Sequence, residues 1–126
     1  MARRKSQTLT DGELRIMDVI WRLEEATVRD VTDELGDVAY NTVQTMLRIL
    51  DEKGYVTYRK DGRAFVYRAL VDRGDARAAA LKHLLGRFFG GSRTALVENL
   101  LRDDDLDAME IDRLKRLVRN AEDPPE

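Results

Sequence analysis

Apolar residues recur three and four positions apart in six separate stretches of the chain, and this spacing predicts six amphipathic helices. Between the third and fourth stretches the spacing changes to the alternation that is typical of β-strands. The pattern therefore predicts a mainly α-helical fold with one small β-hairpin. In chain order, the stripes consist of Leu14, Met17, Ile20 and Trp21, flanked by Ile16, Val19 and Leu23; of Val28, Val31 and Leu35; of Val43, Met46, Leu47 and Leu50; of Leu81, Leu84, Leu85 and Phe88; of Leu96, Val97, Leu100 and Leu101; and of Ile111, Leu114, Leu117 and Val118.

Residues that begin and end helices bracket these stripes. Thr10 and Glu13 form a capping-box pattern that opens the first helix, and Thr27 can cap the second. Gly36 is predicted to end the second helix and Gly54 the third, because glycine readily takes the left-handed conformation that follows a helix. Further N-caps are predicted at Asp72, Ser92 and Asp107, a helix end at Gly90 and Gly91, and short connections at 24–26 and 37–40.

The third predicted helix carries a second, polar stripe opposite its apolar one. Amide, hydroxyl and guanidinium groups can match the hydrogen-bonding patterns that base edges present in the major groove of DNA. The alternative is an ordinary solvated surface, but such a surface would more often carry Glu and Lys. The polar stripe consists of Asn41, Gln44, Thr45 and Arg48.

The hairpin that follows Gly54 has a basic tip. Asp61-Gly62 between alternating residues predicts a tight type I′ turn, with Arg59 and Lys60 before it and Arg63 after it. A projecting tip with three cations can reach a phosphate backbone, although charge can also simply solubilise a turn. A polar-faced helix, a glycine stop and a basic hairpin, in this order, form the second half of a winged helix-turn-helix. Together they favour double-stranded DNA as the partner.

Composition narrows the remaining possibilities. The 126 residues suffice for one domain, or for a small domain with an appendage. The chain has no cysteine and a single histidine, His83, so no disulfide, metal or other cofactor is expected. No apolar run is long enough to enter a membrane and no signal peptide opens the chain, so a cytoplasmic protein is expected.

Charge is unevenly distributed along the sequence. The net charge is −2, yet residues 38–70 carry six cations against three anions. Arg3, Arg4 and Lys5 add a basic N-terminal tail. Because local charge decides where DNA binds, the acidic balance of the whole chain does not exclude a nucleic-acid partner.

The C-terminal part, 72–126, is expected to be a helical dimerisation region with a polar tail, following a winged helix-turn-helix domain at 1–71. Three short helices bury too little apolar surface to be stable alone, so their stripes need a partner. A second copy would give a homodimer whose two recognition helices read an inverted repeat. The predicted interface consists of Leu81, Leu84, Leu85, Phe88, Phe89, Leu96, Leu100, Leu101, Ile111, Leu114, Leu117 and Val118.

The sequence resembles the BlaI/MecI/CopY family of transcriptional repressors from about Leu9 to Leu117. The matching stretches are weak singly, but their order and spacing are fairly specific; they are 13–21, 41–50, 53–56, 65–70 and 89–91. The resemblance implies a homodimer with an N-terminal winged helix-turn-helix and a C-terminal helical dimerisation region. It also implies repression at operators with inverted TACA/TGTA-like halves.

Carried over residue by residue, the resemblance implies base contacts from the start and exposed face of the third helix, and phosphate contacts from the hairpin. Family members often have Lys and Arg where this chain has Asn41 and Gln44, which predicts weaker and less salt-dependent binding here. The implied DNA-contacting residues are Asn41, Thr42, Gln44, Thr45, Arg48, Arg59, Lys60 and Arg63.

Two modes of induction are known in the resembled family. The copper-responsive branch uses a C-terminal cysteine cluster, which this chain lacks. In the penicillinase branch a membrane sensor protease triggers cleavage at an Asn–Phe bond in the dimerisation region, and the aligned pair here is Asn99–Leu100. The implied partner is therefore that sensor, or a protease that it activates. The alternative is that Asn99 is only a helix residue beside a core leucine.

A winged-helix adaptor without an operator is the main rival function. Such a module would tolerate an acidic or apolar face on the third helix. An enzyme is disfavoured, because the sequence has no paired-histidine spacing and no glycine-rich phosphate loop. The acidic cluster at 103–105 has no nearby base, so it is more simply a solvated turn.

Overall fold

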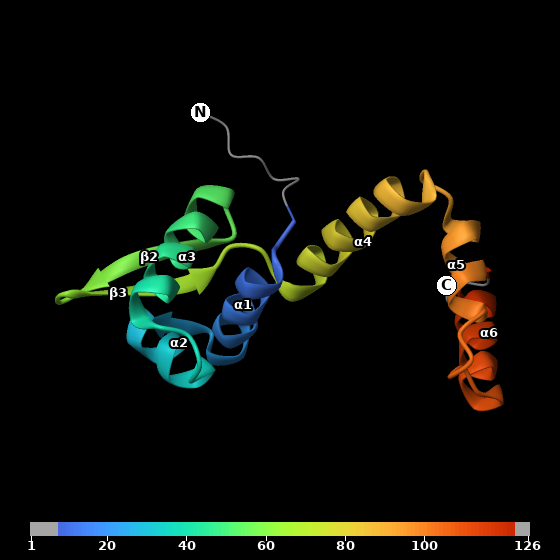
Figure 1. Ribbon diagram of the computed structural model, residues 1–126, viewed down its shortest axis with the longest axis horizontal. Coiled ribbons are helices and arrows are strands. Elements are labelled where there is room, and N and C mark those ends of the chain that lie inside the picture. The colour runs from blue at the N-terminus through green and yellow to red at the C-terminus, as the bar shows by residue number, and fades with distance from the viewer. Residues whose placement is uncertain (1–7, 123–126) are drawn as a thin grey trace. The chain divides into compact units, whose positions relative to one another are not determined.

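The computed structural model describes residues 8–122, and the chain divides within one helix into two compact units, at His83 and Leu84 (Figure 1). The predicted basic tail at residues 3–5 lies outside the described residues. The fold is mainly helical with one small sheet, as predicted. The elements are α1 (Asp11–Leu23), β1 (Glu25–Thr27), α2 (Val28–Leu35), α3 (Tyr40–Lys53), β2 (Val56–Asp61), β3 (Ala64–Ala69), α4 (Arg73–Phe89), α5 (Arg93–Leu101) and α6 (Ala108–Glu122).

The predicted helix ends in the first unit are confirmed. The Thr10 hydroxyl accepts the Glu13 N–H at 3.2 Å, and the Glu13 carboxylate accepts the Thr10 N–H at 2.8 Å, which completes a capping box. Thr27 caps α2 in the same reciprocal way with Asp30. Gly36 and Gly54 follow α2 and α3 with φ of 77° and 85°, in the left-handed region.

The caps predicted for the later helices are also present. Backbone N–H groups in the first turns of α4, α5 and α6 donate to the side chains of Asp72, Ser92 and Asp107, at 2.7, 3.1 and 2.9 Å. Gly90 and Gly91 follow α4 with positive φ. α5 ends at Leu101, before the acidic cluster at 103–105. Local capping chemistry therefore sets most of the helix boundaries in the chain.

The sheet has three antiparallel strands in the order β1-β3-β2, and its first strand was not predicted. Residues 24–26 were expected to form a connection, but Ala26 pairs with Tyr67 and is 1% exposed. Three residues are too few to show an alternating pattern, and the strand exists only because β3 supplies hydrogen bonds to it.

The hairpin turn lies one residue later than predicted. Asp61 pairs with Ala64, so Gly62 and Arg63 form the two-residue loop. Gly62 has φ of 64°, and the only non-glycine residue of the described chain with positive φ is Glu24. The predicted type I′ turn would need positive φ at both central residues, so that prediction is wrong. The single glycine takes the left-handed position and thereby fixes which pair becomes the loop.

The core of the first unit is built from α1, α2, α3 and the sheet. Ile16, Met17, Ile20, Val31, Val43, Leu47, Leu50 and Val56 are fully buried. The predicted stripe of α1 is partly wrong, because Leu14 is 42% exposed while Ile16 and Val19, expected at its flanks, are buried. α1 contacts α2, α3 and the sheet, so its buried face is rotated from the predicted one. Trp21 and Met46 pack only at the edge of the core.

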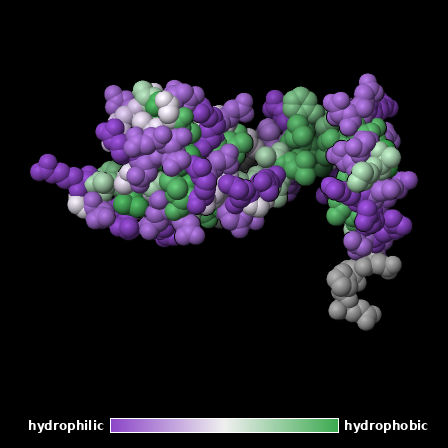
Figure 2. All heavy atoms as spheres, turned by 90° about the horizontal axis from the view of Figure 1, so that it is seen from below, coloured by the Kyte–Doolittle hydropathy of each residue, from purple (hydrophilic) through white to green (hydrophobic). Residues whose placement is uncertain are grey.

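The second unit has no fully buried residue in its described part, Leu84 to Glu122. Hydrophobic side chains instead lie on the surface of α4, α5 and α6 (Figure 2). Phe88 is 76% exposed and Leu117 is 63% exposed. A groove along α5 and α6 is lined mainly by apolar residues, which are Val97, Leu100, Leu101, Ile111, Leu114, Leu117 and Val118.

Candidate nucleic-acid interface

The polar face of α3 is held outward by the burial of its opposite face. Val43, Leu47 and Leu50 are fully buried, so the residues between them must face solvent. The Thr45 hydroxyl donates to the Asn41 carbonyl at 3.0 Å, which orients one side chain along the helix. All five sequence-predicted contacts on α3 are exposed. Four of them share the polar face, and Thr42 lies beside that face in the first turn; the four are Asn41, Gln44, Thr45 and Arg48.

The start of α3 lacks the side-chain cap that opens α1 and α2. Its N-cap is Ala39, whose side chain accepts no hydrogen bond. Tyr40, which was expected in the preceding turn, is the first helical residue and is 39% exposed. The backbone N–H groups in the first turn of α3 therefore receive no capping hydrogen bond from the side chain of residue 39.

The wing, formed by β2, β3 and their loop, places its three predicted cations differently. Arg63 lies in the exposed loop, and Lys60 lies over the Phe65 ring with its Nζ 5.7 Å from the ring centre. Arg59 projects from the other face of the hairpin, where its Nε is 3.2 Å from the Glu25 carboxylate. Of these three predicted cations, Lys60 and Arg63 are thus the ones that no carboxylate of the described residues neutralises.

An aromatic row stiffens the face of the wing that carries Lys60. The Tyr58 ring lies 4.6 Å from that of Phe65 and 5.4 Å from that of Tyr67, between ring centres. Burial raises the pKa of Tyr67, and the neighbouring Tyr58 and Asp51 raise it further, so its hydroxyl stays neutral. Cross-strand aromatic pairs of this kind stabilise the pairing of β2 with β3.

Ion pairs separate the cations of residues 8–71 into two groups. Arg15, Arg22 and Lys53 lie 2.7, 2.8 and 2.7 Å from Asp37, Glu34 and Glu13 respectively, and Arg59 is paired as described above. Within the described chain, the other cations of this range form no ion pair with a carboxylate; they are Arg29, Arg48, Lys60, Arg63 and Arg68.

The sequence pattern did not predict a role for Arg29. It lies in the first turn of α2, and its guanidinium carbon is 5.1 Å from the centre of the Tyr40 ring at the start of α3. No local motif marks this residue, because the contact joins two helices across a turn. The sequence offered one signal for a role of Arg29 in binding: it is an arginine just after the predicted cap Thr27, on the helix that precedes the polar-faced one.

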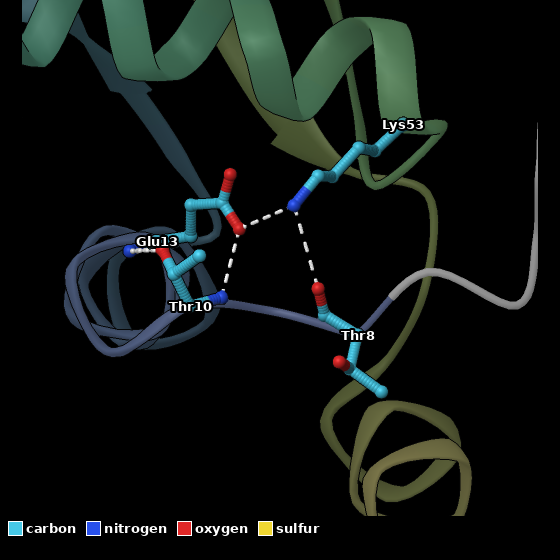
Figure 3. Close-up of polar contacts among 4 residues, drawn as sticks. All are labelled: Thr8, Thr10, Glu13 and Lys53. Carbon is cyan, nitrogen blue, oxygen red and sulfur yellow. Dashed lines mark hydrogen bonds and ion pairs between the residues drawn. The ribbon is translucent and has the colours of Figure 1, made fainter. Parts of the chain in front are cut away.

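A largely buried ion pair connects α3 with α1 (Figure 3). Lys53 donates from Nζ to the Glu13 carboxylate at 2.7 Å and to the Thr8 carbonyl at 3.4 Å. Burial alone would raise the pKa of Glu13, but the hydrogen bonds from Lys53 and from the Thr10 N–H outweigh it and lower that pKa. Glu13 therefore stays ionised, and its contact with Lys53 joins the end of α3 to the start of α1.

The predicted cleavage pair lies in α5, where both Asn99 and Leu100 are exposed.

Across the described residues, no three His, Cys, Asp or Glu side chains lie close enough together to hold a metal ion. No helix of the described part is long and apolar enough to cross a membrane.

Known proteins resemble this chain over most of its length. The penicillinase repressor family model matches residues 9–120. The penicillinase repressor of Bacillus licheniformis is 33% identical over 118 residues, which cover 91% of this chain and 92% of that protein. The methicillin resistance regulatory protein MecI of Staphylococcus aureus is 26% identical over 90% of this chain and 95% of its own length.

A solved structure is similar to this chain in fold as well as in sequence. The solution structure of the DNA binding domain of the repressor BlaI is similar with a TM-score of 0.52 and 35% identity, covering 59% of this chain and 93% of that domain. The family match covers far more than half of the sequence, and the identity to a relative exceeds 30% over nearly its full length. The chain belongs to the penicillinase repressor family.

Proposed function

We propose that this protein is a transcriptional repressor that binds double-stranded DNA as a homodimer at an inverted-repeat operator. The observation that carries the proposal is the exposed polar face of α3 beside Arg48, Lys60 and Arg63, which form no ion pair with a carboxylate of the described residues. Polar side chains on one helix face can read base edges, while cations on a projecting wing can bind phosphates. The relatives named above, a penicillinase repressor and a methicillin resistance regulator, support a regulatory role.

Base reading is assigned to Asn41, Thr42, Gln44 and Thr45, with Arg48 on the same face. Phosphate binding is assigned to Lys60 and Arg63. Arg59 was expected to join them, and it can do so only by leaving the Glu25 carboxylate. We therefore rank Arg59 as the weakest phosphate contact of the wing.

Dimerisation is assigned to 72–126, and winged-helix DNA binding to 1–71. The support is the apolar surface of the second unit, where α5 and α6 leave Leu100 and Leu117 more than half exposed. Such surface costs free energy in water, and a second copy would cover it. A symmetric dimer would also match an inverted repeat, because both share a two-fold axis.

Induction is assigned to cleavage of the Asn99–Leu100 bond by a membrane sensor protease or by a protease that the sensor activates. Both residues are solvent-exposed, although the bond lies within the regular helix α5. Cleavage requires that this short helix open locally, and its apolar face packs too little to oppose opening strongly. Loss of the segment after Asn99 would then remove most of the groove that is proposed to dimerise, including all of its α6 residues.

Selection from a pool of randomised DNA duplexes tests the function. We expect the full-length protein to enrich an inverted repeat, and we expect Gln44→Ala to lower that enrichment without unfolding the chain. Recovery of a single half-site would contradict the dimer. A pool that stays random after repeated rounds would overturn operator binding and would favour a protein-interaction module.

A further inference from the structure

A cation–π contact between Arg29 and Tyr40 connects α2 and α3, the two helices of the helix-turn-helix. The guanidinium of Arg29 lies over the ring of Tyr40, 5.1 Å from its centre. Both residues are exposed, and Arg29 forms no ion pair with any carboxylate of the described residues. By contrast, Arg15 and Arg22 on α1 are each held by a carboxylate within 2.8 Å. No carboxylate of the described residues therefore competes with an external anion for the guanidinium of Arg29.

The ring of Tyr40 fixes where that charge is presented. Tyr40 is the first residue of α3, directly before Asn41, where the polar face begins. An aromatic ring attracts the face of a guanidinium and leaves the N–H groups at its edge free to donate. This contact also limits the rotamers of the long Arg29 side chain, so less conformational entropy is lost when an anion binds.

We propose that Arg29 binds a phosphate of the DNA backbone, and that Tyr40 is the positioning residue that holds its guanidinium beside the reading face. The proposal rests on the DNA-binding function proposed above and adds a contact from an element other than α3 or the wing. Phosphate oxygens accept paired N–H donors from arginine with good geometry. The first helix of a helix-turn-helix also runs across the DNA backbone, which suits a contact made from α2.

The test measures the affinity of full-length protein for the selected inverted repeat and for a scrambled duplex, over a series of salt concentrations. The variants are Arg29→Ala, Arg29→Lys, Tyr40→Ala and Tyr40→Phe, with Arg22→Ala as a matched control, since Arg22 is exposed but paired with Glu34. Arg29→Ala should weaken binding to both duplexes several-fold and alike. The slope of log affinity against log salt should fall by about 0.9, the value of one lost phosphate contact.

Two further measurements distinguish a positioning role of Tyr40 from a merely structural one. They are the binding of the conservative variant Tyr40→Phe and the combined effect of Tyr40→Ala with Arg29→Ala. Tyr40→Phe keeps the ring and should behave as wild type, whereas Tyr40→Ala should weaken both duplexes by less than Arg29→Ala does. In the Arg29→Ala background, Tyr40→Ala should have little further effect, because a positioning residue acts through its partner. Arg29→Lys should keep most of the salt slope but lose part of the affinity, since lysine cannot donate as a planar fork.

Distinct outcomes separate the failure of this inference from the failure of DNA binding. Wild-type affinity and salt slope in Arg29→Ala would overturn the inference while leaving the function intact, provided that Lys60→Ala still weakens binding. A loss confined to the selected repeat, with an unchanged slope, would make Arg29 a base-reading residue and would also overturn it. A wild-type protein that binds neither duplex would overturn both proposals together.

Discussion

The Nζ of Lys53 lies 2.7 Å from Oε1 of Glu13, so one ion pair ties the last turn of α3 to the first turn of α1. The two side chains are only 17% and 5% exposed, and Glu13 also accepts the backbone N–H that opens α1. The contact therefore joins the helix proposed to read DNA to the rest of the winged domain.

Replacing Lys53 with Met should destabilise the protein strongly. Glu13 would keep its burial but lose its cation, and removing one partner of a buried pair costs on the order of 3 kcal/mol. Arg22→Met is the matched control, because the Arg22–Glu34 pair is exposed and such pairs contribute less than about 1 kcal/mol. Urea denaturation measures both. Equal losses in the two variants would contradict a special role for the buried pair.

Stability should fall in mild acid through Glu13. Its pKa is lowered from the ordinary value of 4.5, so the unfolded chain binds this proton more readily than the folded one does. The stabilisation is therefore present above pH 4.5 and is lost as the pH falls through the lower, folded value. Asp37, whose pKa is lowered by its hydrogen bond from Arg15, adds a dependence of the same sign.

The Glu13 contribution is isolated by comparison with Glu13→Gln. Denaturation free energies of wild type and variant, measured at a series of pH values, should converge as the pH falls below 4.5. The Asp37 contribution is common to both proteins and cancels in the difference. Parallel curves across the whole range would show that Glu13 is not linked to folding.

Gly36→Val should destabilise the chain chiefly for a conformational reason. Gly36 has φ of 77°, and an added Cβ would meet no atom within 4 Å, so the Cβ itself causes no steric clash. A branched side chain in the left-handed region costs about 1–2 kcal/mol. Gly36→Asn should cost clearly less, because asparagine tolerates that region. Thermal unfolding of both variants checks this, and equal losses would point to a cause other than φ.

Much of the fold follows from signals that are local in the sequence. Thr10, Thr27 and Ser92 each precede a helix that their hydroxyls cap, and a glycine in the left-handed conformation follows α3. These features depend on a few neighbouring residues and were predicted correctly. The polar face of α3 is equally local, because helical periodicity alone determines which side chains share a face.

The features that were missed depend on contacts between distant segments. β1 is a strand only through pairing with β3, and the burial of Ile16 in place of Leu14 reflects what packs around α1. The Arg29–Tyr40 contact and the Arg59–Glu25 ion pair likewise need the tertiary fold. The sequence could identify the cations that lie near α3, but it could not show which of them form an ion pair with a carboxylate.

Specificity and general affinity should separate by position. Gln44→Ala or Thr45→Ala should reduce the preference for the selected repeat over scrambled DNA by about 1–3 kcal/mol per good base contact. Lys60→Ala or Arg63→Ala should weaken both duplexes alike and flatten the salt dependence. Fluorescence anisotropy titrations at several salt concentrations measure both effects. If all four variants lost affinity equally for both duplexes, the assignment of base reading to α3 would be wrong.

Phe88→Asp should disrupt the proposed dimer. Phe88 is 76% exposed in the single chain, and burying a new unpaired charge at an interface is costly. Leu14→Asp is the matched control, because Leu14 is an exposed apolar residue of the winged domain. Sedimentation should show dissociation only for Phe88→Asp. A wild-type protein that is monomeric at all accessible concentrations would contradict the dimer directly.

Release from DNA should occur because the dimer separates and the winged domain of the second copy is lost. It should not require a change within the winged domain that remains bound. A chain that ends at Asn99 lacks Leu100, Leu101 and α6, and with them most of the apolar groove of the second unit. Two linked half-site contacts gain about 10²- to 10⁴-fold in overall affinity over one, and this gain should disappear in the truncated chain. Its affinity for a duplex with one half-site should match that of the full-length protein, because α1 to β3 are intact. Titrations of both chains against one and two half-sites test this. Equal affinities for the full repeat would refute induction by dimer disruption, whichever protease makes the cut.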